Sequence, residues 1–359
     1  MKILVVGDSY CPWRALGPAI DRLAEQHEVT CFDVVDDSSW QPTTPSEKKI
    51  REYLGSPSQV IERLDDHEVL IVQGAPVTDA VMEAAPRLKL VCVARGGPVN
   101  VDIASATERG VAVVTTPGKN AQAVAELTIA FMVMLARRLP EVVRFLEGGG
   151  ELARDNYEGA KWMGHDLDGH VLGLVGYGQI GHRVARIAIA MGMRVIVSDP
   201  FVPAARVEAD GAELVDLEAL LATADYISLH ARATAETKGL IGRSQIERMK
   251  DGAFLINTAR DTLVDEDAVY DALRSGHLGG GAFDVVRIPD LSIPPELGRR
   301  HRLFDAPNVV ITTHVGGATY ETMGHGGRMA AAEIGRLESG EPFVNLANPA
   351  VLGKAGNHA

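Results

Sequence analysis

A glycine-rich segment near the middle of the chain restricts the possible folds more than any other feature. Residues 173–200 have the sequence GLVGYGQIGHRVARIAIAMGMRVIVSDP. An apolar strand over 172–175 leads into three glycines with the spacing G-x-G-x-x-G, and the helix that follows has its apolar residues on one face. A strand, a glycine turn and a helix in this order predict a turn that binds a dinucleotide.

The three glycines have different expected roles. Gly176 allows the tight turn, Gly178 permits a pyrophosphate to approach the backbone, and Gly181 lets the helix pack against the strand. The N–H groups at the start of the helix would point at the anion. Asp199, 18 residues beyond Gly181, ends the next strand, where its carboxylate would bind the ribose hydroxyls of NAD and repel the phosphate of NADP. NAD is therefore predicted, and Arg232 leaves NADP open if its side chain reaches the adenosine end.

Short apolar segments alternate with helical ones along most of the chain. The expected strands are 2–6, 28–32, 69–72, 88–93 and 111–114, and then 172–175, 195–198, 226–229, 253–257, 281–283 and 309–312. One long helix is expected over 121–147 and another over 319–337. Continuous apolar strands alternating with helices predict an α/β protein with two doubly wound parallel sheets.

Composition and charge argue against several classes of function. The net charge of −13 would repel a nucleic acid, so no such partner is expected. The apolar run over 127–136 is too short to span a bilayer, and the amino-terminal strand is too short for a secretory signal. Three widely spaced cysteines form no disulfide or zinc pattern, and His165 and His170 lack further ligand spacing. We expect a cytoplasmic protein with neither a membrane partner nor a bound metal.

Two polar residues near predicted strand ends indicate the reaction. Arg260 follows the strand over 253–257, and His314 follows the strand over 309–312, at the edge where open α/β sheets bind ligands. An arginine can hold a planar carboxylate through two parallel hydrogen bonds. A histidine can take and return a hydroxyl proton near neutral pH. Each residue alone has an ordinary structural explanation, but together they predict oxidoreduction of a 2-hydroxy acid.

Five segments resemble the D-isomer-specific 2-hydroxyacid dehydrogenases, the group that includes D-3-phosphoglycerate dehydrogenase. They are NVDIASATERGVAVVTTPGKNAQAVAE (100–126), LGLVGYGQIG (172–181), INTARDTLVDEDAV (256–269), GGGAFDV (279–285) and NVVITTHVGGAT (308–319). The resemblance implies an NAD-binding Rossmann domain, 121–317, inserted into a flavodoxin-like substrate domain, 1–120 and 318–359. It implies a homodimer that acts on a D-2-hydroxy acid, phosphorylated and sugar-derived acids included. We expect no room for the carboxyl-terminal regulatory domain of some phosphoglycerate dehydrogenases.

The resemblance also implies roles for single residues. Arg260 would hold the substrate carboxylate, and His314 would be the acid and base. The residues assigned to the cofactor are Gly176, Gly178, Gln179, Ile180, Gly181 and Asp199 at the pyrophosphate and ribose, Thr258 and Asp284 toward the nicotinamide, and Gly316 and Gly317.

The sequence departs from the family pattern beside the expected histidine. The family has a glutamate five residues after the aspartate that matches Asp284, and this glutamate orients the histidine. Pro289 stands there in this chain. Asp290 could replace the glutamate after a one-residue adjustment of the loop, or it could be a solvated loop residue; Glu296 is a more distant candidate. Because a carboxylate beside an imidazole fixes its tautomer and raises its pKa, losing it would weaken proton transfer.

A second departure concerns the substrate. The family's glycine-rich loop presents backbone amides to the substrate carboxylate, and here Arg95 precedes Gly96 and Gly97. Arg95 could bind a second anionic group, such as a phosphate or a distal carboxylate, or it could form a structural salt bridge.

Two other functions remain as alternatives. One is a dinucleotide-sensing interaction protein like the co-repressors that share this fold, which the displaced glutamate favours. The other is an NADP-dependent glyoxylate or hydroxypyruvate reductase, which Asp199 opposes.

Overall fold

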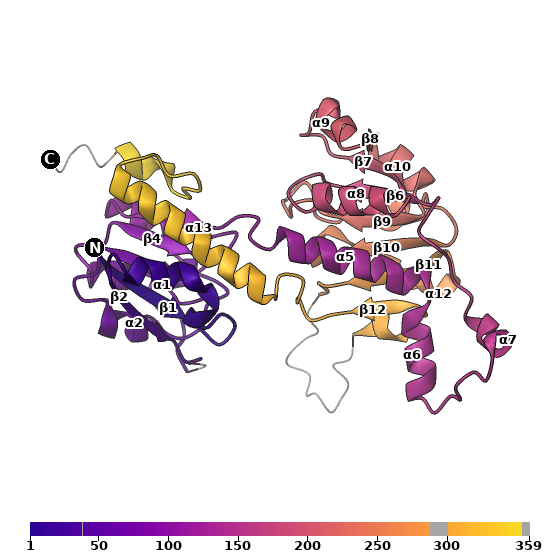
Figure 1. The fold of residues 1–359 in the computed structure, drawn as a ribbon, viewed down its shortest axis with the longest axis horizontal. Helices are drawn as coiled ribbons and strands as arrows, with labels where there is room; N and C mark the ends of the chain where they lie inside the picture. Colours follow the sequence, from indigo (N-terminus) through magenta and orange to yellow (C-terminus); the bar gives the residue numbers. More distant parts are fainter. Residues whose placement is uncertain (38, 288–300, 354–359) are drawn as a thin grey trace. The chain divides into compact units, whose positions relative to one another are not determined.

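The computed structural model describes residues 1–37, 39–287 and 301–353. The chain divides into two compact units (Figure 1). Unit 1 consists of Met1–Asn120 and Ala318–Ala359, and unit 2 is Ala121–Gly317. Each unit contains a parallel sheet, so the α/β class expected from the alternating apolar segments is confirmed.

The described part of unit 1 has a five-stranded sheet in the order β2-β1-β3-β4-β5. Its strands are β1 (Lys2–Gly7), β2 (Glu28–Asp33), β3 (Val69–Val72), β4 (Leu90–Val93) and β5 (Ala112–Thr115). Alternate residues of β1 enter two different cores, since Ile3 and Val5 pack on one face and Leu4 and Val6 on the other. Burial on both faces explains why these strands are continuously apolar.

The helices of unit 1 cover both faces of this sheet (Figure 1). They are α1 (Pro18–Ala24), α2 (Pro57–Leu64), α3 (Asp79–Glu83), α4 (Ile103–Glu108) and α13 (Tyr320–Ser339), with the 3-10 helices η1 (Trp13–Leu16), η2 (Glu47–Lys49) and η7 (Pro349–Gly353). The hydroxyl of Thr319 caps α13 by accepting the N–H of Thr322. Helix α13 packs against α1 and η1, which returns the end of the chain to the first sheet.

The described part of unit 2 has a seven-stranded sheet in the order β12-β11-β10-β9-β6-β7-β8. Its strands are β6 (Val171–Val175), β7 (Arg194–Ser198), β8 (Glu213–Leu214), β9 (Tyr226–Leu229), β10 (Ala253–Asn257), β11 (Leu278–Phe283) and β12 (Val309–Ile311). The strand order reverses between β9 and β6, which makes the carboxyl edge there a crevice for ligands. The edge strand β8 was not predicted, because two residues are too few to show a period.

The helices of unit 2 lie along both faces of its sheet (Figure 1). They are α5 (Ala121–Ala136), α6 (Leu139–Glu147), α7 (Asn156–Gly159), α8 (Gly181–Ala190), α9 (Ala204–Ala209), α10 (Leu217–Thr223), α11 (Arg243–Ile246) and α12 (Glu266–Ser275), with the 3-10 helices η3 (Ala160–Trp162), η4 (Asp261–Leu263) and η6 (Arg302–Asp305). Helix α5 packs on α8 and on strands β10 and β11.

The prediction of one helix over 121–147 is wrong. Helix α5 ends at Ala136 and α6 begins at Leu139, with Arg138 between them in the left-handed region at φ 52°. Pro140 lies in the first turn of α6; it has no N–H to donate to the carbonyl of Ala136, and its ring would clash with that carbonyl in a continuous helix, so the Ala136 carbonyl accepts the N–H of His165 instead. The guanidinium of Arg138 donates to Glu141 at 2.7 Å, which fixes the start of the new helix.

Three further observations concern the composition of the fold. None of the helices in the described ranges is long and apolar enough to cross a membrane. Cys11, Cys31 and Cys92 are free thiols, and the described side chains contain no cluster of three or more metal-binding residues.

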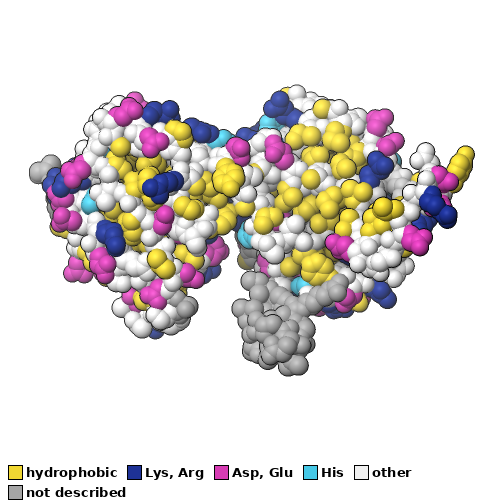
Figure 2. Space-filling model, turned by 60° about the horizontal axis from the view of Figure 1, so that its bottom comes forward, with side chains coloured by type: hydrophobic (Ala, Val, Ile, Leu, Met, Phe, Trp, Pro, Cys, Tyr) yellow, Lys and Arg dark blue, Asp and Glu magenta, His cyan; other side chains and the backbone are white. Residues whose placement is uncertain are grey.

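On the face shown in Figure 2, basic and acidic side chains are interspersed, and hydrophobic side chains gather in patches between them.

Candidate active site

The glycine turn between β6 and α8 has a different geometry at each glycine. Gly176 has φ 98°, and an added Cβ would lie 2.7 Å from the nitrogen of Ala231. An added Cβ at Gly181 would lie 2.3 Å from the Gly176 carbonyl oxygen, so only glycine allows this packing of helix on turn. At Gly178 an added Cβ would meet no atom within 4 Å. The turn is therefore closed toward the protein and open on the side where a ligand would approach.

The start of α8 offers unpaired hydrogen-bond donors. Within the described residues, the backbone N–H groups of Gly178, Gln179 and Ile180 donate no hydrogen bond. A helix start also carries a partial positive charge. Free amides and a positive helix end fit a pyrophosphate, so the residues present suit a dinucleotide.

Asp199 lies beside the same turn, as its position at the end of β7 predicts. One carboxylate oxygen accepts the N–H of Tyr177 at 2.7 Å, and the other accepts the N–H of Phe201 at 2.9 Å. These two bonds fix a half-buried carboxylate next to the glycine turn. Arg232 is exposed and forms no ion pair with any described residue.

Tyr177, inside the glycine motif, has a structural role that was not predicted from the sequence. Its side chain is fully buried, and its hydroxyl donates to Asp210 at 2.8 Å. Burial raises the pKa of Tyr177, and the tyrosine hydrogen bond lowers the pKa of Asp210. His182 contacts the same carboxylate at 2.8 Å. The only sequence signal was a bulky aromatic residue between two glycines. Its burial and its hydrogen bond to Asp210 show that this side chain holds the glycine turn in place.

His230 packs against the glycine turn between β6 and α8. It follows β9 and is half-buried, its Nε2 lies 3.0 Å from the hydroxyl of Ser228, and its buried Nδ1 has no partner among the described residues. Burial lowers the pKa of His230 to about 4, so the imidazole is neutral at neutral pH. Its backbone and Cβ lie where an added Cβ at Gly176 or Gly181 would point, so this neutral histidine packs against the turn.

Arg260 stands on a loop that the end of β10 holds in place. The side chain of Asn257 accepts the N–H of Ala259 at 3.0 Å and donates to the carbonyl of Arg260 at 2.8 Å. The exposed guanidinium of Arg260 donates to the carbonyl of Ala259 at 2.6 Å and has no carboxylate partner among the described residues. It is therefore free to bind an anion. Asn257 was missed in the sequence, although asparagine at a strand end is a typical turn residue.

His314 is presented by a turn that Asp284 organises. Asp284 is 2% exposed, and its carbonyl accepts the N–H of His314 at 2.8 Å. Its carboxylate accepts the Thr312 hydroxyl at 2.6 Å and the N–H groups of Val315 and Gly316 at 2.8 and 2.9 Å. His314 itself has φ 59° and an exposed side chain. One buried carboxylate thus fixes the loop while the imidazole stays open to solvent.

Strand order brings these loops together. Strands β10, β11 and β12 are parallel neighbours, so the residues that follow them share one edge of the sheet. The N–H of Asp284 donates to the carbonyl of Asn257 at 3.0 Å, which joins the Arg260 loop to the His314 loop. The hydroxyls of Thr258 and Thr128 lie 3.1 Å apart and connect this edge to α5. Arginine, aspartate and histidine therefore converge on the carboxyl edge of the sheet that also carries the glycine turn.

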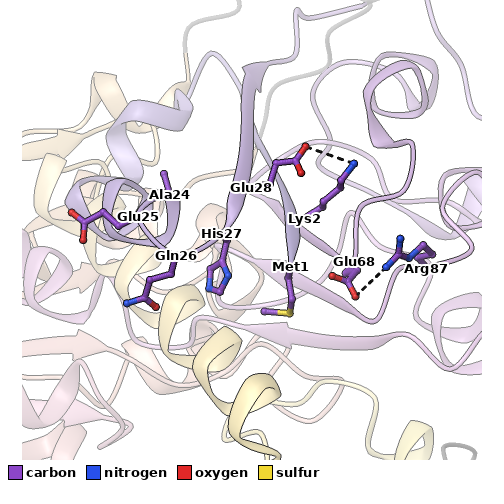
Figure 3. Close-up of a pocket in the computed structure, with 9 residues that line it drawn as sticks. All are labelled: Met1, Lys2, Ala24, Glu25, Gln26, His27, Glu28, Glu68 and Arg87. Atoms are coloured by element: carbon purple, nitrogen blue, oxygen red, sulfur yellow. Dashed lines mark ion pairs between the residues drawn. The ribbon is translucent and has the colours of Figure 1, made fainter.

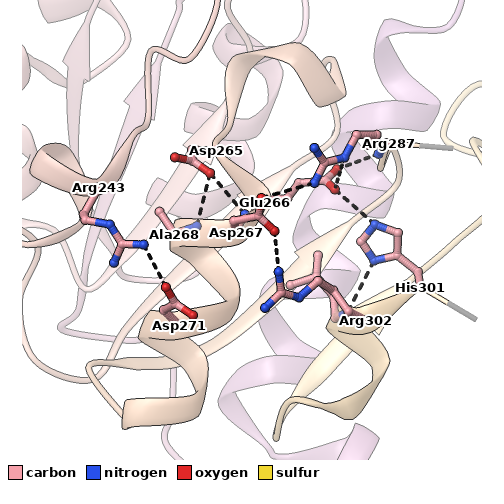
Figure 4. Close-up of polar contacts among 10 residues, drawn as sticks. Arg243, Asp265, Glu266, Asp267, Ala268, Asp271, Arg287, His301 and Arg302 are labelled. Atoms are coloured by element: carbon pink, nitrogen blue, oxygen red, sulfur yellow. Dashed lines mark hydrogen bonds and ion pairs between the residues drawn. The ribbon is translucent and has the colours of Figure 1, made fainter. Parts of the chain in front are cut away.

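The two carboxylates expected beside His314, Asp290 and Glu296, lie outside the described residues. Both flanks of that segment contact the start of α12 (Figure 4): Glu266, 6% exposed, accepts the N–H of Arg287 at 2.5 Å and lies 3.0 Å from Nε2 of His301. Nothing in the sequence distinguishes Glu266, because an acidic residue in the first turn of a helix is ordinary.

The loop predicted to meet the substrate lies at the carboxyl edge of the sheet in unit 1. Arg95 donates to the carbonyl of Glu52 at 2.7 Å and forms an ion pair with the Glu52 carboxylate, so the salt bridge that was one of its two alternatives is present. Gly96 and Gly97 donate no backbone hydrogen bond to any described group, and an added Cβ at either would meet nothing within 4 Å. This loop therefore has two amides without a described acceptor and open space beside both Cα atoms.

A pocket of about 420 Å³ lies at the opposite edge of that sheet, where β1 and β2 begin (Figure 3). Both of its basic side chains are already paired, with Lys2 lying 2.8 Å from Asp66 and 3.6 Å from Glu28, and Arg87 lying 3.8 Å from Glu68. Ligands of parallel sheets bind at the carboxyl ends of the strands, and this pocket lies at the amino ends. We assign it no functional role.

Comparisons with known proteins agree with this geometry. Residues 129–316 match the family model described as D-isomer specific 2-hydroxyacid dehydrogenase, NAD binding domain. The D-3-phosphoglycerate dehydrogenase of Archaeoglobus fulgidus is 37% identical over 82% of this chain and 54% of its own length, so the chain spans about half of that relative. The glyoxylate reductase of Korarchaeum cryptofilum is 35% identical over 87% of this chain and 90% of its own length.

A solved structure extends the similarity to both units. The crystal structure of the TT0316 protein from Thermus thermophilus is 33% identical, covers 97% of this chain and 100% of its own, and has a TM-score of 0.71. The matched family model lies within unit 2, which is therefore the NAD-binding Rossmann domain. The resemblance noted in the sequence is confirmed, and the chain belongs to the D-isomer specific 2-hydroxyacid dehydrogenase family.

Proposed function

We propose that the protein is an NAD-dependent oxidoreductase that interconverts a D-2-hydroxy acid and the corresponding 2-oxo acid. The observation that carries this proposal is the arrangement of Arg260, Asp284 and His314 after three adjacent strands of the NAD-binding domain. An exposed guanidinium without a carboxylate partner among the described residues and an exposed imidazole on a fixed turn are the two groups that this reaction needs.

Each residue has a separate role in the proposed reaction. A bound nicotinamide cofactor would supply the redox chemistry, since its oxidised form can take a hydride from C2 of the hydroxy acid and its reduced form can give one to C2 of the oxo acid. The glycine turn and Asp199 hold the cofactor, and the Arg260 guanidinium holds the substrate carboxylate through two hydrogen bonds, which orients C2. The His314 imidazole takes the hydroxyl proton during oxidation and returns it during reduction. In unit 1, the substrate domain of this proposal, the free amides of Gly96 and Gly97 would bind the acid.

Asp290 remains our proposed carboxylate beside His314, with Glu296 as the second candidate. Both flanks of their segment are held by Glu266, through the N–H of Arg287 and the ring of His301.

The test follows NADH absorbance with purified protein and a panel of 2-oxo acids, phosphorylated and sugar-derived acids included. Turnover of at least one acid, lost in the His314→Ala variant, would establish the dehydrogenase. Tight NADH binding without turnover of any acid would favour the dinucleotide-sensing alternative. The relatives are named as dehydrogenases and reductases, which does not favour that alternative.

Cofactor choice is predicted to depend on Asp199. Its carboxylate would bind the ribose hydroxyls of NADH and repel the phosphate of NADPH, and like-charge contacts of this kind cost several kcal/mol, so we expect kcat/KM to favour NADH by about 100-fold. Asp199→Ser should remove most of this preference. Steady-state kinetics with both cofactors measure it, with Glu208→Ser, at an exposed glutamate without an ion pair to the described residues, as the matched control. A wild-type preference for NADPH would support the NADP-dependent reductase instead.

We also propose that two copies associate through α6. Leu139, Val143 and Leu146 lie on one face of this helix and are 40%, 50% and 36% exposed, and a stripe of this kind is usually covered. Light scattering should give a mass of twice the 38.4 kDa chain. Val143→Asp should shift the mass to that of one chain, whereas Val35→Asp, at an exposed position in unit 1, should not. A monomeric wild type would refute the dimer.

The three free cysteines support a cytoplasmic location. Cys11 and Cys92 are buried as thiols, and proteins of oxidising compartments usually pair their cysteines.

A further inference from the structure

Lys119 carries a charge without a matching partner in the described part of the chain. It follows β5 in unit 1, its side chain is half-buried, and its Nζ lies 3.8 Å from the thioether sulfur of Met323. No carboxylate of the described residues lies within ion-pair distance of it. An ammonium group has three donors, and a thioether is a weak acceptor. The hydrogen-bonding capacity of this half-buried cation is therefore largely unused.

The neighbouring carboxylate is already occupied. Asp8 is fully buried, and it accepts the N–H groups of Tyr10, Cys11 and Gly74 at 2.8 to 2.9 Å. Burial raises the pKa of the Cys11 thiol to about 11, so no thiolate neutralises the lysine. Burial lowers the pKa of Lys119, and the positive charge of Arg95 opposes protonation further.

The start of helix α13 and the guanidinium of Arg95 add positive charge near Lys119. Met323 lies in the first turn of α13, where the partial charge of a 20-residue helix is positive. The positive charge of Arg95 lowers the pKa of both Lys119 and Asp8, but its guanidinium is already paired with the Glu52 carboxylate. An ammonium group beside a positive helix end is a site that an anion would stabilise.

The free amides of the glycine loop lie next to Lys119 along the same sheet edge. The carbonyl of Arg95 accepts the N–H of Thr116 at 2.8 Å, and the carbonyl of Thr116 accepts the N–H of Lys119 at 3.4 Å. The loop with Gly96 and Gly97 is therefore tied to the loop with Lys119. Two separate sets of donors lie there: neutral amides and a charged ammonium.

We propose that Lys119 binds a second anionic group of the substrate, a carboxylate or a phosphate, and so selects 2-hydroxy acids that carry two anionic groups. This inference rests on the proposed dehydrogenase function. It assigns to Lys119 the role that the sequence suggested for Arg95, because Arg95 is paired and Lys119 forms no ion pair with the described residues.

The experiment compares matched pairs of 2-oxo acids that differ in the second anion. One pair is 2-oxoglutarate and 2-oxopentanoate, and the other is phosphohydroxypyruvate and hydroxypyruvate. Each is reduced with NADH by wild type, Lys119→Met and Lys119→Arg. Lys48→Met, at an exposed lysine of unit 1 without an ion pair to the described residues, is the control for the loss of one positive charge.

We expect wild type to prefer one doubly anionic acid over its singly anionic partner by about 10- to 100-fold in kcat/KM, as one charge-assisted contact allows. Lys119→Met should abolish that preference, mainly through KM, while turnover of the singly anionic acids changes less than about threefold. Lys119→Arg should retain it in part. The preferred pair identifies the second anion as carboxylate or phosphate.

Other results would overturn the inference. An equal loss for both members of each pair would mean that Lys119 acts on the shared carboxylate or on the fold. A wild type with no preference would also overturn it. If wild type reduces no acid, the proposed function fails separately. Lys119 is then tested by Tm: phosphate or 2-oxoglutarate should stabilise Lys119→Met less than it stabilises wild type and Lys48→Met, and equal stabilisation of all three proteins refutes the site.

Discussion

Replacing His314 should lower kcat by about 100- to 10,000-fold, the range that a positioned general acid and base contributes. The side chain is exposed and no described side chain hydrogen-bonds its ring, so its loss removes no core packing. The backbone at His314 has φ 59°, which asparagine tolerates better than most residues. We therefore expect His314→Asn to keep the turn and lose the proton transfer, while His314→Ala also strains the turn.

Stopped-flow and steady-state kinetics with the best 2-oxo acid would measure this effect, with NADH binding followed by fluorescence. Both variants should bind NADH as wild type does, because the glycine turn and Asp199 are untouched. His165→Ala, an exposed histidine in the same unit, is the matched control. If Asp290 assists His314, Asp290→Asn should reduce kcat in the same direction and by less, whereas an unaltered kcat would move that role to Glu296 or to no carboxylate. A His314→Asn variant with normal kcat would remove this residue from the chemistry.

Replacing Arg260 should affect substrate binding and orientation together. Arg260→Ala removes the partner of a desolvated carboxylate and should lower kcat/KM by about 100- to 1000-fold. Arg260→Lys keeps the charge but loses the two parallel hydrogen bonds, so we expect a loss of about 10- to 100-fold. In both variants KM for the acid should rise, since the carboxylate is held in the ground state as well as in the transition state.

The structure makes this result interpretable. The Arg260 guanidinium forms no ion pair with the described residues, and Asn257 holds the loop through its own side chain. The substitutions therefore leave the two Asn257 hydrogen bonds in place and affect only the bond from the guanidinium to the Ala259 carbonyl. Arg243→Lys, an exposed arginine paired with Asp271, controls for the substitution itself. An unchanged KM for the acid with Arg260→Ala would show that the carboxylate binds elsewhere, and the amides of Gly96 and Gly97 would then be the first place to look.

Local features could be predicted from the sequence because their causes are local. Strands 226–229 and 253–257 coincide with β9 and β10, since strands of a parallel sheet are buried on both faces and so are continuously apolar. The conformations of Gly176 and Gly181 follow from the absence of a Cβ at two close contacts. The break at Arg138 was missed because the apolar pattern continues across it, although Pro140 was a visible warning.

The sequence by itself determined the fold class and the dinucleotide turn, and it singled out Arg260 and His314 as candidates, because all of these depend on residue type and short spacing. Only the tertiary structure decided that β10, β11 and β12 are neighbours, and that Asp284 holds the His314 turn across 28 positions of sequence. It also decided that Arg95 is paired with Glu52 while Lys119 forms no ion pair with the described residues. These contacts depend on which distant segments pack together, and a pattern of neighbouring residues does not determine that packing.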